Sequence, residues 1–425
     1  MVRTYNFLAP SLHPNTLVDI SISEPGPSSQ EPLVRHLAVK HGQFNPLGSV
    51  RKMLMGEDGN LIVADHDFRI SSLKLGSVEE PVSPEILSQH TVPSKKGATW
   101  VGLTAVQGGV VSGLSSGHLS YTSSSSSAPQ SRNVPSPLTT VLSASSSSTS
   151  FGMAGKEVEV SLWDVEKTFS SPAEDVNMGK RKKDALEVGE IWRAKNLPNN
   201  NLSLRQPVYH LCMSFLNDTS QDIVTGTKAG QVRRYDTRQR KVVSNWKIAR
   251  EGGIGAVQPG TSEHELFFSD RSSFLGSMDL RTGKLLYSYP KLTATAHHLR
   301  AVPTSTSNIG LATISSDSTF RLLSTTAPPA DGYKGNMSSN TTKGEVKSMV
   351  GGVGVGDFLW RGWGEREVVV EKKERREKGE GEETDSEDED EEIWEGMSEA
   401  AEDEDEDESE EEQPVPVKKA KVSRR

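Results

Sequence analysis

The sequence predicts an all-β fold, a WD-repeat-type β-propeller of about seven blades, followed by a disordered acidic C-terminal tail. No long segment shows helical periodicity, and short apolar runs alternate with Gly, Asp and Ser, as in hairpins. Similar hairpins recur at a period of about 40–45 residues, several with a Trp-Asp or related pair at a strand end, which is typical of propellers. Roughly 300 residues remain outside the biased segments, which suits seven blades.

The N-terminal part carries the weakest pattern. Residues 1 to about 50 show no clear alternation, so we expect a degenerate strand or an extension there. Weak copies of the hairpin follow at 55–75 and 99–124, and a degenerate copy stands at 344–362. The clearest examples of an apolar strand, a turn of small or acidic residues and an alternating strand lie at 59–65, 108–123, 222–236, 264–279 and 309–325.

Large apolar or aromatic residues share one position when the second strands of the hairpins are aligned. Tyr235, Met278 and Leu323 stand 43 and 45 residues apart, and Trp163 precedes Tyr235 by 72 residues. We expect these side chains to pack between neighbouring blades. Aspartates near the strand ends fit tight turns, where Asp caps its own backbone. They are Asp164, Asp236, Asp270, Asp279 and Asp317.

We place the propeller at residues 1–370 and a disordered charged tail at 371–425. Two insertions are expected within the propeller, a serine-rich disordered one at about 122–150 and a basic polar one at about 170–184. Such segments do not bury enough apolar area to offset the entropy lost on ordering.

The net negative charge of the chain comes from the tail. Residues 380–412 carry 22 acidic and no basic side chains, so the remainder holds 48 Lys and Arg against 36 Asp and Glu. A mildly basic body suits work beside nucleic acid or acidic proteins, and a merely solvated basic surface is the equal alternative. The single cysteine, Cys212, excludes internal disulfides and a cysteine-rich zinc site.

The sequence predicts no catalytic, metal-binding or cofactor-binding arrangement. The stretch GLSSG at 113–117 joins two β runs, whereas a nucleophile elbow needs a strand-to-helix turn. The stretch GGVGVG at 351–356 lacks the Lys-Ser/Thr and the helix of a phosphate-binding loop. His297 and His298 lie about 25 residues before Leu323, where WD repeats often carry a structural His. Without a signal peptide or an apolar run of about 20 residues, we expect a cytosolic or nuclear protein with no membrane contact.

Three stretches in the middle of the chain carry a family resemblance. They are FGMAGKEVEVSLWDVEK at 151–167, GEIWRAKNLPNNNLSLRQPVYHLCMSFL at 189–216 and DIVTGTKAGQVRRYDTRQRKVV at 222–243. Together they resemble the nucleolar WD-repeat ribosome biogenesis factors of the Nsa-one family, which act on precursors of the large ribosomal subunit. The resemblance is strong over 151–243, fair to about 326, and weak before 100 and after 330.

The resemblance can be followed residue by residue. The matching positions are Lys156 and Glu157 in the first stretch, Lys195, Asn196, Pro198, Leu202, Leu204, Arg205 and Pro207 in the second, and Thr225, Gly226, Arg233, Tyr235 and Asp236 in the third. Val158 stands where the family has Asn, and Asn200 and Ser203 stand where it has Asp. The two lost acids make this loop more positive and weaken the case for a salt bridge to Arg205.

We expect the loop at 194–207 to be a stiff connection between blades. Pro198 and Pro207 restrict the unfolded chain, and the Asn side chains form local turns. Leu202 and Leu204, two residues apart, are expected to face one side and anchor the loop. The candidate contacts to a partner protein or RNA are Lys195, Asn196, Arg205, Arg233 and Arg234. The alternative is that the loop residues only hold the loop together and that the two strand arginines are only solvated.

The resemblance implies a non-enzymatic scaffold in large-subunit biogenesis, which binds pre-ribosomal particles in the nucleolus through assembly-factor proteins and precursor rRNA. It also implies release by an AAA-type ATPase, and we expect a monomer within a complex and no cofactor. One alternative is a WD-repeat chromatin or histone adaptor, whose acidic tail binds basic histone segments. Another is a propeller hydrolase with a metal in the central channel. The shortage of His, Asp and Glu residues that could converge on such a site argues against this alternative.

The charged segments hold short motifs. Basic runs typical of nuclear import signals consist of Lys180, Arg181, Lys182 and Lys183, and of Lys418, Lys419, Lys421, Arg424 and Arg425 in the basic C-terminus at 418–425. Ser386 and Ser409 each have an acid three residues later, which suits an acidophilic kinase. The acidic run either keeps the chain soluble or competes with nucleic acid for basic surfaces, and Ile393-Trp394 within it is a candidate docking motif.

Overall fold

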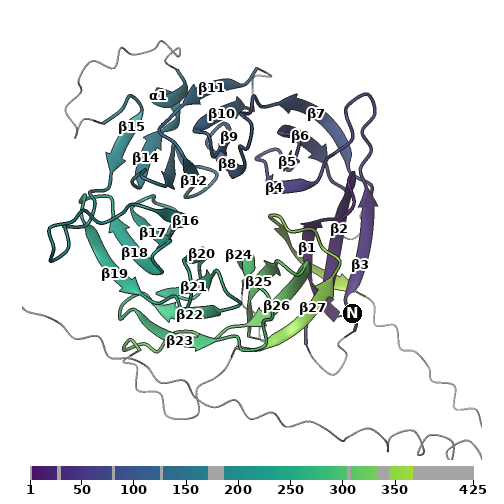
Figure 1. Ribbon diagram of the computed structural model, residues 1–425. Coiled ribbons are helices and arrows are strands. Elements are labelled where there is room, and N and C mark those ends of the chain that lie inside the picture. Colours follow the sequence, from purple (N-terminus) through teal and green to yellow (C-terminus); the bar gives the residue numbers. More distant parts are fainter. Residues whose placement is uncertain are drawn as a thin grey trace, which may run out of the picture. The chain divides into compact units, whose positions relative to one another are not determined.

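The computed structural model describes residues 2–25, 30–78, 82–124, 128–170, 186–303, 308–333 and 344–366. The chain divides into two units, Met1–Val369 and Val370–Arg425, and every described residue belongs to the first. These residues form a seven-bladed β-propeller, in which seven four-stranded sheets surround a central axis (Figure 1). The basic insertion from residue 171 and the whole tail lie outside the described residues, and with them the import motifs, Ser386, Ser409 and Trp394.

Six blades are built from four consecutive antiparallel strands, and the first strand of each is the innermost (Figure 1). Blade 2 holds β4 (Val50–Met55), β5 (Leu61–Asp65), β6 (Arg69–Lys74) and β7 (Glu85–Thr91). Blade 3 holds β8 (Trp100–Val106), β9 (Gly109–Leu114), β10 (His118–Ser123) and β11 (Gln130–Asn133). Blade 4 holds β12 (Leu138–Ser143), β13 (Ser150–Gly155), β14 (Ser161–Asp164) and β15 (Glu190–Arg193), with the short helix α1 (Val165–Phe169) after β14.

The remaining three of these blades follow the same order. Blade 5 holds β16 (His210–Phe215), β17 (Asp222–Thr227), β18 (Gln231–Asp236) and β19 (Val242–Lys247). Blade 6 holds β20 (Ile254–Pro259), β21 (Glu265–Asp270), β22 (Leu275–Asp279) and β23 (Lys284–Ser288). Blade 7 holds β24 (Ala296–Ala301), β25 (Ile309–Ser315), β26 (Thr319–Ser324) and β27 (Val346–Gly351).

Blade 1 closes the ring with strands from both ends of the propeller. Its order is β28 (Leu359–Arg366), β1 (Val2–Pro10), β2 (Thr16–Ser23) and β3 (Leu33–Ala38). The N-terminal region therefore supplies three strands, which corrects the prediction of a degenerate strand or an extension. The pattern is hard to recognise there because β1 and β2 are buried along most of their length, polar residues such as Asn6 and Asp19 included.

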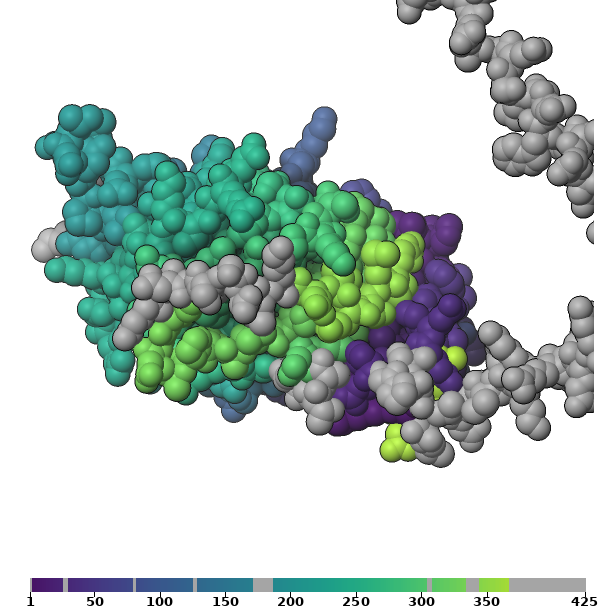
Figure 2. All heavy atoms as spheres, turned by 90° about the horizontal axis from the view of Figure 1, so that it is seen from below, coloured from purple at the N-terminus to yellow at the C-terminus, as the bar shows by residue number. Residues whose placement is uncertain are grey.

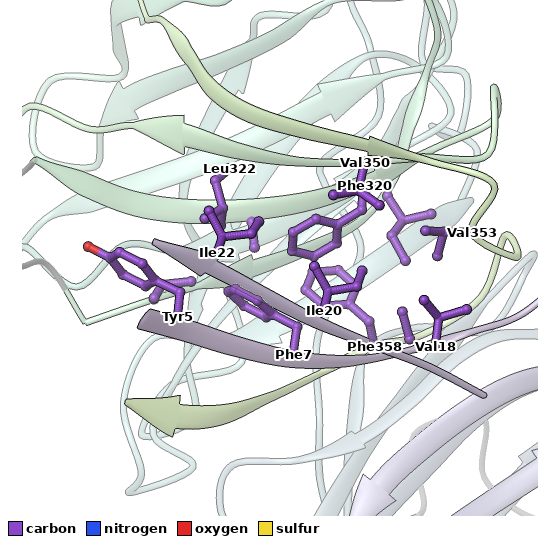
Figure 3. Close-up of a cluster of buried hydrophobic side chains, with 14 of the residues drawn as sticks. Tyr5, Phe7, Val18, Ile20, Ile22, Phe320, Leu322, Val350, Val353 and Phe358 are labelled. Carbon is purple, nitrogen blue, oxygen red and sulfur yellow. The ribbon is translucent and has the colours of Figure 1, made fainter. Parts of the chain in front are cut away.

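The degenerate copy expected at 344–362 is in fact two strands of different blades. β27 completes blade 7, whereas β28 pairs with β1 in blade 1. A shared core joins the two blades, with ring centroids 4.8 Å apart for Phe7 and Phe320 and 5.4 Å apart for Phe320 and Phe358 (Figure 3). The ring is thus held closed by apolar packing as well as by strand pairing.

The aligned strand positions have the predicted role. Trp163, Tyr235, Met278 and Leu323 are all buried, and each lies in a core cluster with residues of the preceding blade. The turn aspartates also act as predicted, because carboxylate oxygens accept the backbone N–H groups of nearby residues. The bonds are Arg238 N to Asp236 (2.9 Å), Arg281 N to Asp279 (2.8 Å), Lys167 N to Asp164 (2.9 Å) and Ser272 N to Asp270 (2.9 Å).

The serine-rich stretch at 122–150 is not a disordered insertion over its described residues. It supplies β11 and β12, so blade 4 begins inside it. Leu138 and Val141 are buried in the core, and the small hydroxyls are used within the fold. Ser143 donates to the carbonyl of Ala105 (2.6 Å) and Thr139 to that of His210 (2.8 Å). Composition was misleading because a few apolar residues suffice when hydroxyls satisfy the backbone of neighbouring strands.

Candidate interaction surface

The candidate surface lies on one face of the ring, which we call the top face. The turn between the second and third strands and the connection to the next blade emerge on this face, because successive strands are antiparallel. The longest described connection of this kind joins β15 to β16 at residues 194–209. Figure 2 shows this teal part of the chain standing out from the body.

Asparagine side chains hold this connection together, as predicted. Asn200 Oδ1 accepts the backbone N–H groups of Leu202 (3.0 Å) and Leu204 (2.9 Å). Asn196 Nδ2 donates to the carbonyl of Gln206 (2.8 Å), and Gln206 Nε2 donates to that of Pro198 (2.9 Å). These bonds cross the loop and pair several of its backbone groups within the loop itself. The Asn196 amide is used inside the loop, so it serves the loop's shape.

The expected leucine anchor is wrong. Leu202 and Leu204 are 76% and 59% exposed, and the loop is anchored instead at its ends by the buried Ala194 and Val208. Residues two apart share a face only in extended chain, and Ser203 between the leucines has a φ of 58°, in the left-handed region. The loop therefore presents two apolar side chains to solvent beside its charged ones.

Two of the predicted contact residues are at the surface. Arg205 is 65% exposed and pairs with Glu157 from the blade 4 turn, with Nη1 and Oε2 3.2 Å apart. Arg205 therefore has an ion-pair partner although the loop lacks the two aspartates. Lys195 is exposed, and its backbone N–H is fixed by the carbonyl of Arg240 (2.6 Å). The loop thus offers two cations from a backbone held at both ends.

The two strand arginines differ. Arg233 is only 3% exposed, and its guanidinium donates to Gln231 Oε1 (2.8 Å). Contrary to the prediction, it is therefore not placed to contact a partner. Its strand packs on blade 4, and this side of the strand is covered. Arg234 is partly exposed and pairs with Asp222 at 3.2 Å. Its role is therefore tied to a cross-strand ion pair in blade 5.

A buried histidine underlies the loop. His210 Nδ1 lies 3.1 Å from Thr225 Oγ1, and its Nε2 lies 3.9 Å from a carboxylate oxygen of Glu159. Burial lowers the pKa of His210, although Glu159 opposes this shift. Sequence reasoning missed His210, although it stands 25 residues before Tyr235, the spacing that drew attention to His297 and His298.

Sequence reasoning also missed an aromatic ring between two lysines. The ammonium groups of Lys156 and Lys228 lie 6.0 Å and 5.2 Å from the ring centroid of Tyr209. Both lysines are exposed and Tyr209 is partly buried. The family resemblance included Lys156 but gave it no role. Lys228 comes close to it only because blades 4 and 5 are neighbours in the ring.

The central channel holds a charged cluster of a different kind. Asp357 Oδ1 lies 3.1 Å from His298 Nδ1, and Asp357 Oδ2 lies 3.5 Å from Lys52 Nζ. Burial raises the pKa of Asp357, but Lys52, His298 and Arg300 together lower it well below its usual value. Among the described residues, no group of three or more His, Cys, Asp or Glu is placed to hold a metal ion. Within the same residues, no helix is long and apolar enough to cross a bilayer.

Comparisons with known proteins give partial similarity. No protein-family model matches the chain. Ribosome biogenesis protein NSA1 of Meyerozyma guilliermondii is 28% identical over 105 residues, which are 24% of this chain and 26% of that protein. The protein of the same name from Kluyveromyces lactis is 30% identical over 87 residues, which are 18% of this chain and 20% of that one. The matches thus span about a quarter or less of these relatives.

A solved structure supports the fold. The β-propeller domain of Cps50 (Swd1) from Myceliophteria thermophila superposes with a TM-score of 0.50 and 12% identity, covering 72% of this chain and 86% of that one. At this identity the likeness concerns the propeller fold alone.

Proposed function

We propose that the chain is a non-enzymatic scaffold in the biogenesis of the large ribosomal subunit, which binds precursor particles in the nucleolus. The observation that carries this proposal is the similarity to the two NSA1 proteins, whose names state a role in ribosome biogenesis. The AKNLP–LRQP motif in the 194–207 loop adds to it. A rigid ring with charged loops on one face suits a protein that acts by binding.

The loop between blades 4 and 5 is the proposed contact to the particle. Its backbone is fixed by its own asparagines, so little ordering entropy is lost when a partner binds. Lys195 and Arg205 supply the charge, and Leu202 and Leu204 supply exposed apolar contact beside it. This combination suits an assembly-factor protein or precursor rRNA. Entry into the nucleus by the two basic runs and release by an AAA-type ATPase complete the proposal.

The test is purification of a tagged full-length chain from its own cells at moderate salt, with identification of the RNA and proteins that accompany it. We expect large-subunit rRNA precursors and nucleolar assembly factors. A preparation dominated by histones, without precursor rRNA, would overturn the proposal in favour of a chromatin adaptor.

A variant pair tests the loop itself. We expect Lys195→Gln with Arg205→Gln to reduce recovery of precursor rRNA about tenfold, which corresponds to roughly 1.4 kcal/mol. The matched control is Lys284→Gln with Arg281→Gln, also a lysine and an ion-paired arginine, at the turn between β22 and β23 of blade 6. Equal loss in both pairs would assign the effect to total charge, and no loss in either would remove the loop from the contact.

A further inference from the structure

One hydrogen bond recurs in six blades and defines equivalent positions on the top face. The first residue after the second strand donates its backbone N–H to the residue immediately before the first strand. The donors and acceptors are His66 to Ser49, Ser115 to Thr99, Lys156 to Pro137, Lys228 to Tyr209, Arg271 to Gly253 and Ser316 to Thr295, at 2.8–3.1 Å. Because the blades are related by rotation about the axis, these donors lie on a circle around the channel.

The side chains on this circle are not evenly distributed. Three consecutive blades, 4 to 6, place a long cation there, namely Lys156, Lys228 and Arg271, and serines flank them in blades 3 and 7. All three cations are exposed. Arg250, in the connection between blades 5 and 6, adds a fourth, and its guanidinium carbon lies 4.1 Å from the centroid of Phe274. We call these four residues the cation arc.

The charges of the cation arc are available. Within the described part of the chain, none of the four pairs with a carboxylate, whereas many other cations on the molecule do. The nearby acid Glu157 is paired with Arg205. Asp270 is buried and accepts the backbone N–H groups of Arg250 and Ser272. Glu251 is the exposed acid that remains beside the arc.

We propose that the cation arc binds the phosphate backbone of single-stranded RNA across blades 4 to 6. Lys156 and Lys228 share the Tyr209 ring, so their ammonium groups are no farther apart than the sum of their distances to it. Cations spaced around a curve match a flexible strand of regularly spaced phosphates. A duplex is too stiff to follow such a tight curve.

RNA is favoured over an acidic protein segment because the two NSA1 proteins to which this chain is similar are named for ribosome biogenesis. The choice of RNA as the polyanion rests on the proposed function. Different variants test the arc and the Lys195 and Arg205 loop, so each can fail independently.

The test measures binding of a labelled oligouridylate to the purified full-length chain by fluorescence anisotropy over about 50–200 mM salt. We expect Lys156→Gln, Lys228→Gln and Arg271→Gln together to weaken binding about tenfold or more. The slope of log affinity against log salt should fall in magnitude by about 2, because each lost phosphate contact removes about 0.7 for a single strand. The matched control carries Lys167→Gln, Lys241→Gln and Lys284→Gln, exposed lysines of the same three blades at the opposite ends of their strands.

The other outcomes separate this inference from the proposed function. Equal weakening by both triple variants means that only net charge matters. If the wild-type chain does not bind the oligouridylate but binds a peptide of residues 384–412 through the arc, the occupant is an acidic segment. A chain that binds RNA through the arc but never accompanies precursor rRNA in cells keeps this inference and refutes the proposed function. An arc variant with unchanged RNA affinity refutes this inference alone.

Discussion

At the scale of single residues, a buried histidine contributes to the pH dependence of the propeller's stability. His210 is fully buried between Thr225 and Glu159, and burial lowers its pKa. Below the unfolded pKa of about 6.5, the unfolded chain takes up a proton that the folded chain does not. The contribution of His210 therefore reduces the free energy of unfolding as the pH falls from about 7 towards 5.

We expect His210→Asn to flatten this pH dependence, measured as the free energy of urea unfolding at several pH values. The variant should also lose about 1–2 kcal/mol at neutral pH, because the bond to Thr225 is disturbed in a buried site. His66→Asn, at an exposed turn, is the control and should leave the slope unchanged. If the free energy of unfolding depends on pH equally steeply in His210→Asn and the wild type, His210 is not the source of this dependence.

At the scale of strands, a buried ion pair fastens the closing strand. Arg361 on β28 reaches Asp19 on β2 at 3.4 Å and also donates to the carbonyl of Gly76 (2.7 Å). The two side chains are 6% and 7% exposed. Burial raises the pKa of Asp19, and Arg361 opposes the shift. The pair therefore links the innermost strand of blade 1 to its third strand and to blade 2.

Removing one member of the Asp19–Arg361 ion pair should lower the free energy of unfolding more than replacing both members with apolar residues. We expect Arg361→Met to destabilise the fold by about 3–5 kcal/mol, because it leaves the Asp19 carboxyl buried without its partner. Adding Asp19→Leu should recover most of that loss, since two apolar side chains then fill the site. The measurement is a double-mutant cycle by urea unfolding. A double variant as unstable as Arg361→Met would mean that shape, rather than charge, is decisive there.

The strands also show what the sequence can and cannot predict. The hairpins of blades 5 to 7 were visible because Gly and Asp turns and apolar runs are local signals. Blade 1 was not, because its innermost strand comes from the other end of the propeller and its N-terminal strands are buried. The prediction that Leu202 and Leu204 anchor the loop was wrong because Ser203, between them, has a left-handed backbone conformation. The cation arc could not be predicted from the sequence. Three of its members occupy equivalent positions in different blades, and only the strand pairing shows which positions are equivalent.

At the scale of the whole molecule, the proposed binding surfaces require a closed ring. The top-face positions keep their spacing only if every blade is held by two neighbours. Closure rests on β28, which pairs with β1 along its length and places Leu359 and Trp360 beside the buried cores on either side. Without β28, the edge of β1 would be an open row of unpaired backbone donors and acceptors.

Truncation therefore gives the sharpest test of closure. A chain ending after Arg366 keeps β28, and one ending after Gly351 loses β28 and Phe358. We expect the longer chain to melt in one transition and remain monomeric by size-exclusion chromatography. The shorter chain should melt about 10 °C lower or more and associate through the β1 edge, because several kcal/mol of packing are lost with the strand. If the two melt alike, blade 1 holds the ring closed with three strands, and the cation arc does not depend on closure.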